Sequence, residues 1–281
     1  MKINRRGFLK AFGQAMLGGA LTTAGGCAYG LQVEPEWLTI EQIQLPIRGL
    51  KAALEGFKIV HLSDFHLYPH TKIELIQQAI ELANSLKPDL AVFTGDYVLE
   101  TAGSIFELAP VLATLNPRYG HWAILGNHDL WTDAAMVRAG LEKAGIPVLV
   151  NKGVPIQVGR ERMYVAGIDD GWSGRPDLPA ALANWPSDAP VILLAHEPDL
   201  ADAFAPDERI SLQLSGHSHG GQVRVPGLGA PILPYLGQKY DRGLHRVNQT
   251  WVYTNRGIGV INPPIRINCP PEITEIILVS Q

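Results

Sequence analysis

The first half of the chain alternates continuous apolar runs with stretches in which apolar residues recur every three or four positions. The continuous runs are typical of buried strands, and they predict strands over 57–62, 90–94 and 121–125. The helical spacing between these runs predicts helices over 73–86, 104–115 and 133–144. This strand–helix alternation predicts parallel strands in an α/β domain.

The second half has shorter apolar runs and fewer stretches with helical spacing. It predicts strands over 148–150, 156–158, 163–166, 191–195, 211–214, 251–254 and 273–279. A lead-in segment before the first buried run predicts two more strands, over 38–40 and 43–45. Two sheets packed face to face, with helices outside them, accommodate this many strands.

Composition narrows the class of protein. Nearly half of the 281 residues are hydrophobic, which is enough for a sizeable core and argues against extensive disorder. The 23 basic and 27 acidic residues leave a net charge of −4, so nucleic acid is not a favoured partner. Two cysteines, Cys27 and Cys269, do not indicate a disulfide framework.

The first thirty residues differ from the rest of the chain. Asn4–Lys10 (Asn-Arg-Arg-Gly-Phe-Leu-Lys) resembles a twin-arginine export signal, and an uncharged Gly/Ala-rich stretch follows over 11–26. A membrane-spanning helix needs about 20 strongly apolar residues, so we interpret the stretch as the apolar region of a signal. Small residues predict cleavage after Ala28, and lipidation of Cys27 is a minority alternative.

We therefore predict export by the twin-arginine machinery, to the periplasm or to an outward-facing membrane anchor, with contact to a membrane surface. An uncleaved anchor and a basic N-terminal helix of a cytosolic enzyme are the alternatives for this segment.

Five short polar runs come directly after predicted buried strands. They are Asp64-Phe65-His66, Gly95-Asp96, Gly126-Asn127-His128-Asp129, His196 and Gly216-His217-Ser218-His219. Active sites of open α/β sheets collect at the carboxyl ends of strands, so these side chains are expected to meet. An Asp-x-His run in an extended segment places both side chains on one side. Glycine before Asp96, Asn127 and His217 allows close backbone approach.

Carboxylate, imidazole and amide groups together suit Zn, Mn or Fe. Any one histidine in this set is more readily explained by a structural hydrogen bond than by metal binding. Five such runs in this order are not explained in that way. Two adjacent ions clamp the attacking and the leaving oxygen of a phosphoryl transfer. The four histidines outside the runs, His61, His70, His121 and His245, are expected to be structural or exposed.

The ordered runs over 64–219 resemble the calcineurin-like metallophosphoesterase superfamily. The resemblance implies an α/β fold, a four-layer sandwich of two mixed β-sheets flanked by helices. It assigns one divalent or mixed-valence ion to Asp64, His66, Asp96 and His219. It assigns a second to Asp96, Asn127, His196 and His217, with Asp96 bridging and a metal-bridging hydroxide attacking phosphorus. His128 is expected to bind a phosphate oxygen and protonate the leaving group, and Asp129 to orient His128.

A weaker resemblance extends to an exported bacterial branch of the superfamily, whose members include phosphodiesterases and UDP-diacylglucosamine pyrophosphatases of the lipid A pathway. It rests on the twin-arginine start and on runs such as Arg256-Gly257-Ile258-Gly259. Asn127 and Arg256 are predicted to bind substrate. Arg224, Lys239 and Arg242 are further candidates for phosphate contacts, although ordinary surface charge is favoured for at least two of these four basic residues.

The Gly/Pro-rich segment 223–243 predicts a long loop beside the site. Most of its apolar residues are expected to be buried, and an apolar wall for a lipid or aromatic group is the alternative. The chain is thus divided into a signal or anchor (1–28), a lead-in (29–55) and a metallophosphoesterase domain (56–281).

The predicted function is a metal-dependent phosphodiesterase or pyrophosphatase acting on a small-molecule or lipid-linked phosphate ester. The alternatives are a UDP-diacylglucosamine pyrophosphatase, a phosphoprotein phosphatase and a non-catalytic binding module.

Overall fold

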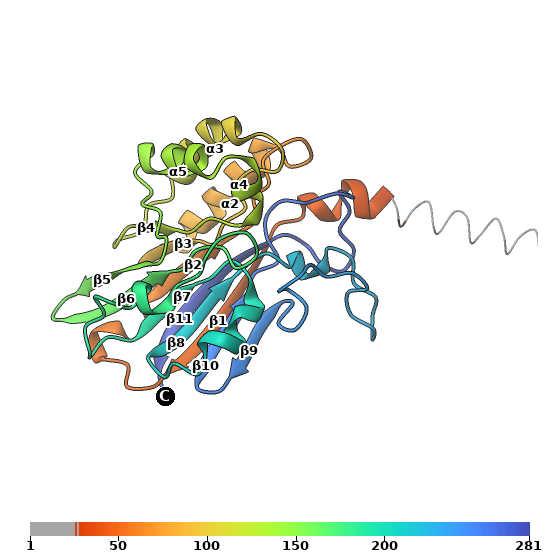
Figure 1. Cartoon of the computed structure of the whole chain (residues 1–281). Helices are drawn as coiled ribbons and strands as arrows, with labels where there is room; N and C mark the ends of the chain where they lie inside the picture. The colour runs from red at the N-terminus through yellow and green to blue at the C-terminus, as the bar shows by residue number, and fades with distance from the viewer. Residues whose placement is uncertain (1–25, 27) are drawn as a thin grey trace, which may run out of the picture.

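Two β-sheets lie face to face in the computed structural model, which describes residues 26 and 28–281 (Figure 1). The first sheet has five strands in the order β1-β11-β2-β3-β4. Its strands are β1 (Thr39–Ile47), β11 (Glu272–Ser280), β2 (Lys58–Leu62), β3 (Leu90–Phe93) and β4 (His121–Ala123). β2, β3 and β4 are parallel, whereas β11 is antiparallel to β2 and parallel to β1. This sheet is therefore mixed.

The second sheet has six strands in the order β5-β6-β7-β8-β10-β9. Its strands are β5 (Lys152–Val158), β6 (Glu161–Gly167), β7 (Val191–Leu194), β8 (Ile210–Ser215), β10 (Thr250–Thr254) and β9 (Gly243–Val247). The four central strands are parallel, and the two edge strands are antiparallel to their neighbours. This sheet is mixed as well.

A cluster of buried apolar residues lies between the sheets. Ile59, Val92 and Ile276 of the first sheet pack in it with Val165 and Leu214 of the second. Burying each side chain of this size contributes about 1.5–3 kcal/mol. The continuous apolar run of β2 is explained by burial on both faces, because Ile59 faces this cluster while Val60 and Leu62 belong to a second one.

Helices cover the outer faces. α2 (Ile73–Ser85), α3 (Ile105–Leu112) and α5 (Ala134–Lys143) pack against the first sheet. The short helices α6 (Leu178–Ala181) and α7 (Ala201–Phe204) lie by the second sheet, whose outer apolar cluster includes Leu178 and Ala181. The result is the predicted four-layer sandwich of two mixed sheets flanked by helices.

Most predicted elements are confirmed, but several segments differ. Segment 148–150 is not a strand, since only an isolated bridge joins Val148 to Ala123. The two predicted lead-in strands form one strand, β1. A short helix, α4 (Asn127–Thr132), and the edge strand β9 were not predicted. α4 has only six residues, four of them polar, and is too short to show helical periodicity.

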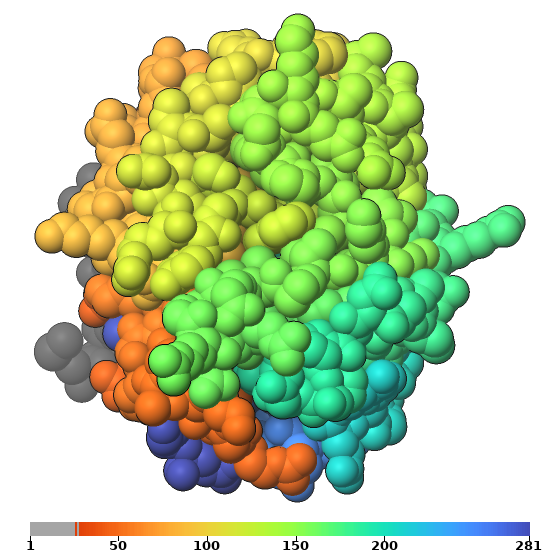
Figure 2. Space-filling view, turned by 90° about the vertical axis from the view of Figure 1, so that its left-hand side faces the viewer, coloured from red at the N-terminus to blue at the C-terminus, as the bar shows by residue number. Residues whose placement is uncertain are grey.

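The lead-in segment contributes a full strand to the fold. β1 pairs with β11 along its whole length, from Thr39 opposite Glu272 to Ile47 opposite Ser280. Consistent with this pairing, orange N-terminal residues lie next to dark blue C-terminal residues at the lower edge of the space-filling view (Figure 2).

The twin-arginine run and Cys27 lie outside the described residues. Residues 28–32 are helical and lead toward β1. Among residues 26 and 28–281, no helix has the length and apolar character needed to cross a membrane.

Candidate metal centre

The ends of strands from both sheets are joined by hydrogen bonds to one another. The Asp64 N–H, after β2, donates to the Gly95 carbonyl after β3 over 3.0 Å. The His217 N–H, after β8 of the other sheet, donates to the Asp64 carboxylate oxygens over 3.0 and 3.1 Å. Asp64 therefore ties the two sheets together where the predicted ligands converge.

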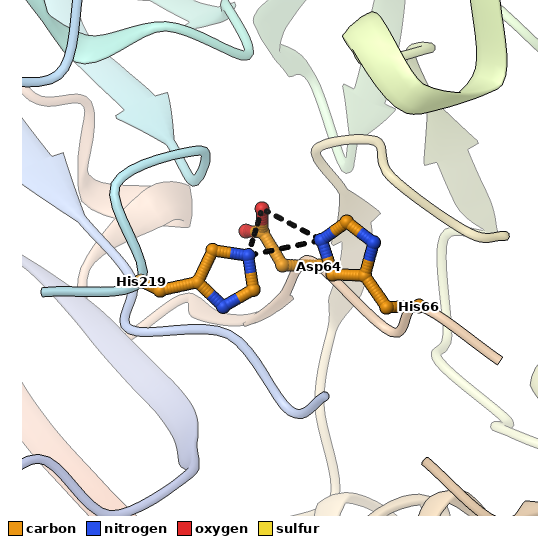
Figure 3. A group of neighbouring side chains, drawn as sticks. All are labelled: Asp64, His66 and His219. Atoms are coloured by element: carbon orange, nitrogen blue, oxygen red, sulfur yellow. Dashed lines mark hydrogen bonds and ion pairs between the residues drawn. The ribbon is translucent and has the colours of Figure 1, made fainter. Parts of the chain in front are cut away.

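A first group of side chains consists of Asp64, His66 and His219 (Figure 3). All three are buried. The two Nε2 atoms of His66 and His219 lie 2.9 Å apart, and Asp64 Oδ1 lies 3.4 Å from His219 Nε2 and 3.9 Å from His66 Nε2. Three ligand atoms thus point at one another from segments far apart in the sequence.

A second group consists of Asp96, His196 and His217. His196 Nδ1 donates to the Thr94 carbonyl (2.6 Å), and His217 Nε2 donates to the Tyr235 carbonyl (2.8 Å). A carbonyl only accepts, so the bonded nitrogen of each ring carries a proton, and the other nitrogen, His196 Nε2 or His217 Nδ1, is left for the cluster. Backbone carbonyls have no sequence signal, so Thr94 and Tyr235 were not predicted as partners.

Asp96 lies between the two groups. Its Oδ2 is 3.5 Å from His66 Nε2 and 3.2 Å from His196 Nε2. Within the described part of the chain, the buried Asn127 Oδ1 has no hydrogen-bond partner, and His196 Nε2 makes no well-aligned hydrogen bond besides its ion-pair contact with Asp96. Buried polar atoms nearly always have a partner. Because these two atoms lie beside an acidic cluster, a bound cation would provide the missing partner.

Charge in the cluster also fits cations. Burial lowers the pKa of His66 to about 3 and that of His217 to about 4, so both rings are neutral ligands near pH 7. Burial acts in the same direction on the pKa of His219, which is well below its usual value. At His196 burial is outweighed by Asp96 and Asp64, whose negative charges raise the pKa. The carboxylates thus stabilise positive charge at this position.

Backbone conformation at the site is unusual. Asp64, His66, Asp96, His217 and His219 all have positive φ, between 44° and 69°. Non-glycine residues rarely adopt this conformation. Asp64 and His66 therefore do not converge through an extended segment, as predicted, but through two left-handed residues after β2 has ended.

Close packing explains why glycine occurs at two of the positions that precede predicted ligands. A Cβ on Gly126 would overlap Asp96 Oδ1 and the His196 ring. A Cβ on Gly216 would overlap Ser63 Oγ and the Asp64 carboxylate. The role assigned to these glycines, close approach of backbone to the site, is confirmed.

His128 and Asp129 lie on α4, next to the cluster. The His128 ring is 4.7 Å from the His66 ring, is half-buried, and one of its nitrogens groups with His66 and Asp96. The Asp129 carboxylate does not bond to this ring. It accepts from the backbone N–H groups of Asp96 (2.9 Å), Tyr97 (2.9 Å) and Gly126 (3.0 Å). Asp129 therefore positions the Asp96 backbone rather than the His128 imidazole.

The Arg256 guanidinium is held by two carboxylates. Its Nε lies 2.6 Å from Glu272 Oε2, and its Nη2 donates to Glu41 Oε1 over 2.7 Å. Glu272 is buried and attracts the guanidinium toward β1 and β11, so these ion pairs do not support the predicted contact of Arg256 with substrate, which stays a prediction. The neighbouring Gly257 packs against Asp64, where a Cβ would approach the Asp64 Cβ to 2.7 Å.

Two of the other candidate phosphate contacts are ion-paired elsewhere. Arg224 pairs with Asp241, and Lys239 pairs with Asp202. The expectation that most apolar residues of 223–243 are buried is wrong for four of them. The exposed side chains are Val225, Leu228, Ile232 and Tyr235.

The four remaining histidines make hydrogen bonds away from the cluster. They are His61 to Thr94, His70 to Asn262, His121 to the Leu115 carbonyl and His245 to the Arg242 carbonyl. Their structural role is as predicted.

A buried centre of carboxylates and imidazoles is typical of metallohydrolases. Comparison with known proteins agrees with this class. The family model for calcineurin-like phosphoesterases matches residues 57–221. The chain is 35% identical over 283 residues to the uncharacterized metallophosphoesterase YkuE of Bacillus subtilis (strain 168), covering 99% of each. It is 35% identical over 282 residues to the phosphodiesterase YaeI of Escherichia coli (strain K12), covering 99% of this chain and 100% of that one.

The chain belongs to the calcineurin-like phosphoesterase family and is a metal-dependent phosphoester hydrolase.

Proposed function

We propose that the protein hydrolyses phosphodiesters or pyrophosphates with two divalent ions, Mn, Zn or Fe. Asp64, His66, Asp96 and His219 would hold one ion, and Asp96, Asn127, His196 and His217 the other. The observation that carries this proposal is the position of Asp96, whose Oδ2 lies within 3.5 Å of a ring nitrogen from each group. When bound, such ions neutralise phosphoryl charge and provide an activated water near pH 7.

The chain's own residues would orient the ester and handle the leaving group. His128 lies at the edge of the cluster, and its ring makes no hydrogen bond to any described residue. Its imidazole is free to bind a phosphoryl oxygen and to deliver a proton to the departing oxygen, as general acids do near pH 7. Asn127, at the start of α4, would contribute its amide oxygen to an ion and contact the substrate.

A diester substrate is supported by the name of the Escherichia coli relative, which describes a phosphodiesterase over a full-length match. The test is hydrolysis of bis-p-nitrophenyl phosphate, p-nitrophenyl phosphate and UDP-diacylglucosamine by protein that has been chelated and reloaded with Mn, Zn, Fe or Mg. Metal-dependent hydrolysis of the diester supports the proposal. Hydrolysis of the monoester alone would favour a phosphomonoesterase, including the phosphoprotein phosphatase alternative, and hydrolysis of UDP-diacylglucosamine alone would favour the lipid A alternative.

We also propose export through the twin-arginine route, to the periplasm or to an outward-facing anchor. The run Asn4–Lys10 supports it. The exposed apolar side chains of Tyr29, Leu31 and Val33, which follow the predicted cleavage site, support contact with a membrane surface. Replacing Arg5 and Arg6 with Lys and fractionating the cells tests the route. Unchanged distribution of the protein would contradict it.

A further inference from the structure

Three exposed aromatic side chains from different parts of the chain meet beside the metal centre. They are Trp131 of α4, Trp172 between β6 and α6, and Tyr235 in the loop before β9; we call them the aromatic rim. Their exposed fractions are 51%, 42% and 58%. Large apolar side chains gathered at a surface mark binding sites more often than isolated ones do.

The rings contact one another in sequence. The Trp131 and Trp172 centroids are 5.0 Å apart with an angle of 80° between the ring planes. The Trp172 and Tyr235 centroids are 5.7 Å apart at 70°. These edge-to-face arrangements are the favoured geometry of aromatic pairs, and they present faces and edges that a further ring can match.

The aromatic rim is continuous with the catalytic side chains. The Trp131 ring lies 4.8 Å from the His128 ring, and the Trp172 ring lies 5.8 Å from the His217 ring. A group attached to a phosphoryl centre held by His128 and by the ion that His217 would bind therefore reaches the rim through a short linkage.

Buried carboxylates hold Trp172 in place. Glu197 Oε2 accepts from the Gly171 N–H (2.8 Å) and its Oε1 from the Trp172 N–H (3.2 Å), while Asp170 Oδ1 also accepts from the Trp172 N–H (3.1 Å). Gly171 packs so closely that a Cβ would approach Leu200 to 2.8 Å and Glu197 to 3.0 Å. Glu197 directly follows the predicted ligand His196, so one short segment positions both the ligand and the ring.

The Trp131 ring and the Tyr235 backbone are also held. Trp131 Nε1 donates to Ser173 Oγ over 2.7 Å, which ties α4 to the segment that carries Trp172. The Tyr235 carbonyl accepts from His217 Nε2. Segments that are already held lose little conformational entropy on binding, so a rim built in this way is preorganised for a ligand.

We propose that the aromatic rim binds a planar aromatic ring joined to the phosphoryl group of the substrate, and so selects aryl or nucleoside esters over alkyl esters. This inference rests on the proposed function, because the phosphoryl group must be held at the metal centre. The three neutral rings stand at steep angles to one another, so a planar ring placed among them can form further edge-to-face or stacked aromatic pairs. An alkyl chain has no π-system and cannot form such pairs.

The test compares binding of phenylphosphonate and methylphosphonate to metal-loaded protein by calorimetry and by quenching of indole fluorescence. Neither probe is hydrolysed, and each has one organic group. The wild type is expected to bind phenylphosphonate about tenfold more tightly. Trp172→Ala and Trp131→Ala should reduce this preference to about threefold or less, with methylphosphonate affinity retained. Trp37→Ala, which removes an exposed Trp outside the rim, is the matched control and should keep the full preference.

Adenosine 5′-phosphate and ribose 5-phosphate form a second pair of probes. If the wild type prefers the nucleotide and Trp172→Ala removes that preference, the ring belongs to a nucleoside. If the preference is confined to phenylphosphonate, the ring belongs to an aryl ester. Equal binding of both phosphonates by the wild type would overturn the inference and leave the proposed function standing. Binding of neither phosphonate would overturn the inference, and the proposed function would fall with it only if metal-dependent hydrolysis of bis-p-nitrophenyl phosphate were absent as well.

Discussion

His66 and His219 are separated by 153 positions in the chain, yet their Nε2 atoms lie 2.9 Å apart. Burial lowers the pKa of both rings, so two neutral imidazoles face each other with the Asp64 carboxylate beside them. A cation shared by these three groups accounts for the arrangement, because each group then directs a lone pair at positive charge.

Replacing His219 with Ala should therefore release bound metal. Loss of one ligand from this group is expected to lower activity by more than about a hundredfold, because a bound ion supplies several kcal/mol of transition-state stabilisation. Elemental analysis after gel filtration measures the metal. His245→Ala, which removes a histidine bonded only to the Arg242 carbonyl, is the control and should keep its full metal content.

Asp96→Asn should lose metal as well as rate. The carboxylate reaches ring nitrogens of both groups, at 3.5 and 3.2 Å, and an amide cannot offer two anionic oxygens. Metal content and hydrolysis of bis-p-nitrophenyl phosphate are the two measurements. An active variant with the wild-type metal content would rule out a bridging role for Asp96.

His128→Ala should keep the metal and lose rate. General acid catalysis contributes about 10²–10⁴-fold, and the loss should be largest for esters with poor leaving groups, which depend most on a proton. Rates for a series of substituted phenyl esters test this expectation. An equal loss across the series would remove His128 from the acid role.

Gly126→Ala should impair the centre although Ala suits the Gly126 backbone, with φ at −115°. Its Cβ would overlap Asp96 Oδ1 and the His196 ring, and overpacking of this kind costs about 1–3 kcal/mol. Metal affinity and thermal unfolding should both fall. Gly103→Ala is the matched control, because its nearest neighbour, the Thr101 methyl group, is 3.9 Å away; it should change neither.

Arg256→Ala should destabilise the fold and leave the KM for small diesters unchanged. It leaves the buried Glu272 carboxylate without its ion pair, and breaking a buried pair costs about 3 kcal/mol or more. Denaturant unfolding measures the loss, and Glu272→Gln in the same chain should restore part of it. A raised KM with unchanged stability would return Arg256 to the substrate site.

The spacing of apolar residues was sufficient to predict those helices and strands in which buried positions recur regularly. α2 and α5 were predicted within one or two residues, and Asp133 accepts from the Met136 N–H at the start of α5, as expected of the predicted helix start. Prediction from local pattern failed where polar residues of the site interrupt the periodic spacing of apolar residues. α4 has only six residues, four of them polar, and the guanidinium of Arg256, which was predicted to bind substrate, is ion-paired with the buried Glu272 carboxylate.

The order and type of the polar runs, from Asp64 to His219, were enough to indicate metal-dependent phosphoester hydrolysis, because ligand chemistry is a property of side chains. The sequence also determined the two-sheet architecture, since the period of apolar positions reports burial. Only the tertiary structure decided which ligands meet, how five left-handed residues direct them, and that Trp131, Trp172 and Tyr235 form one surface. These relationships depend on contacts between segments distant in the chain, which no local pattern of residues records.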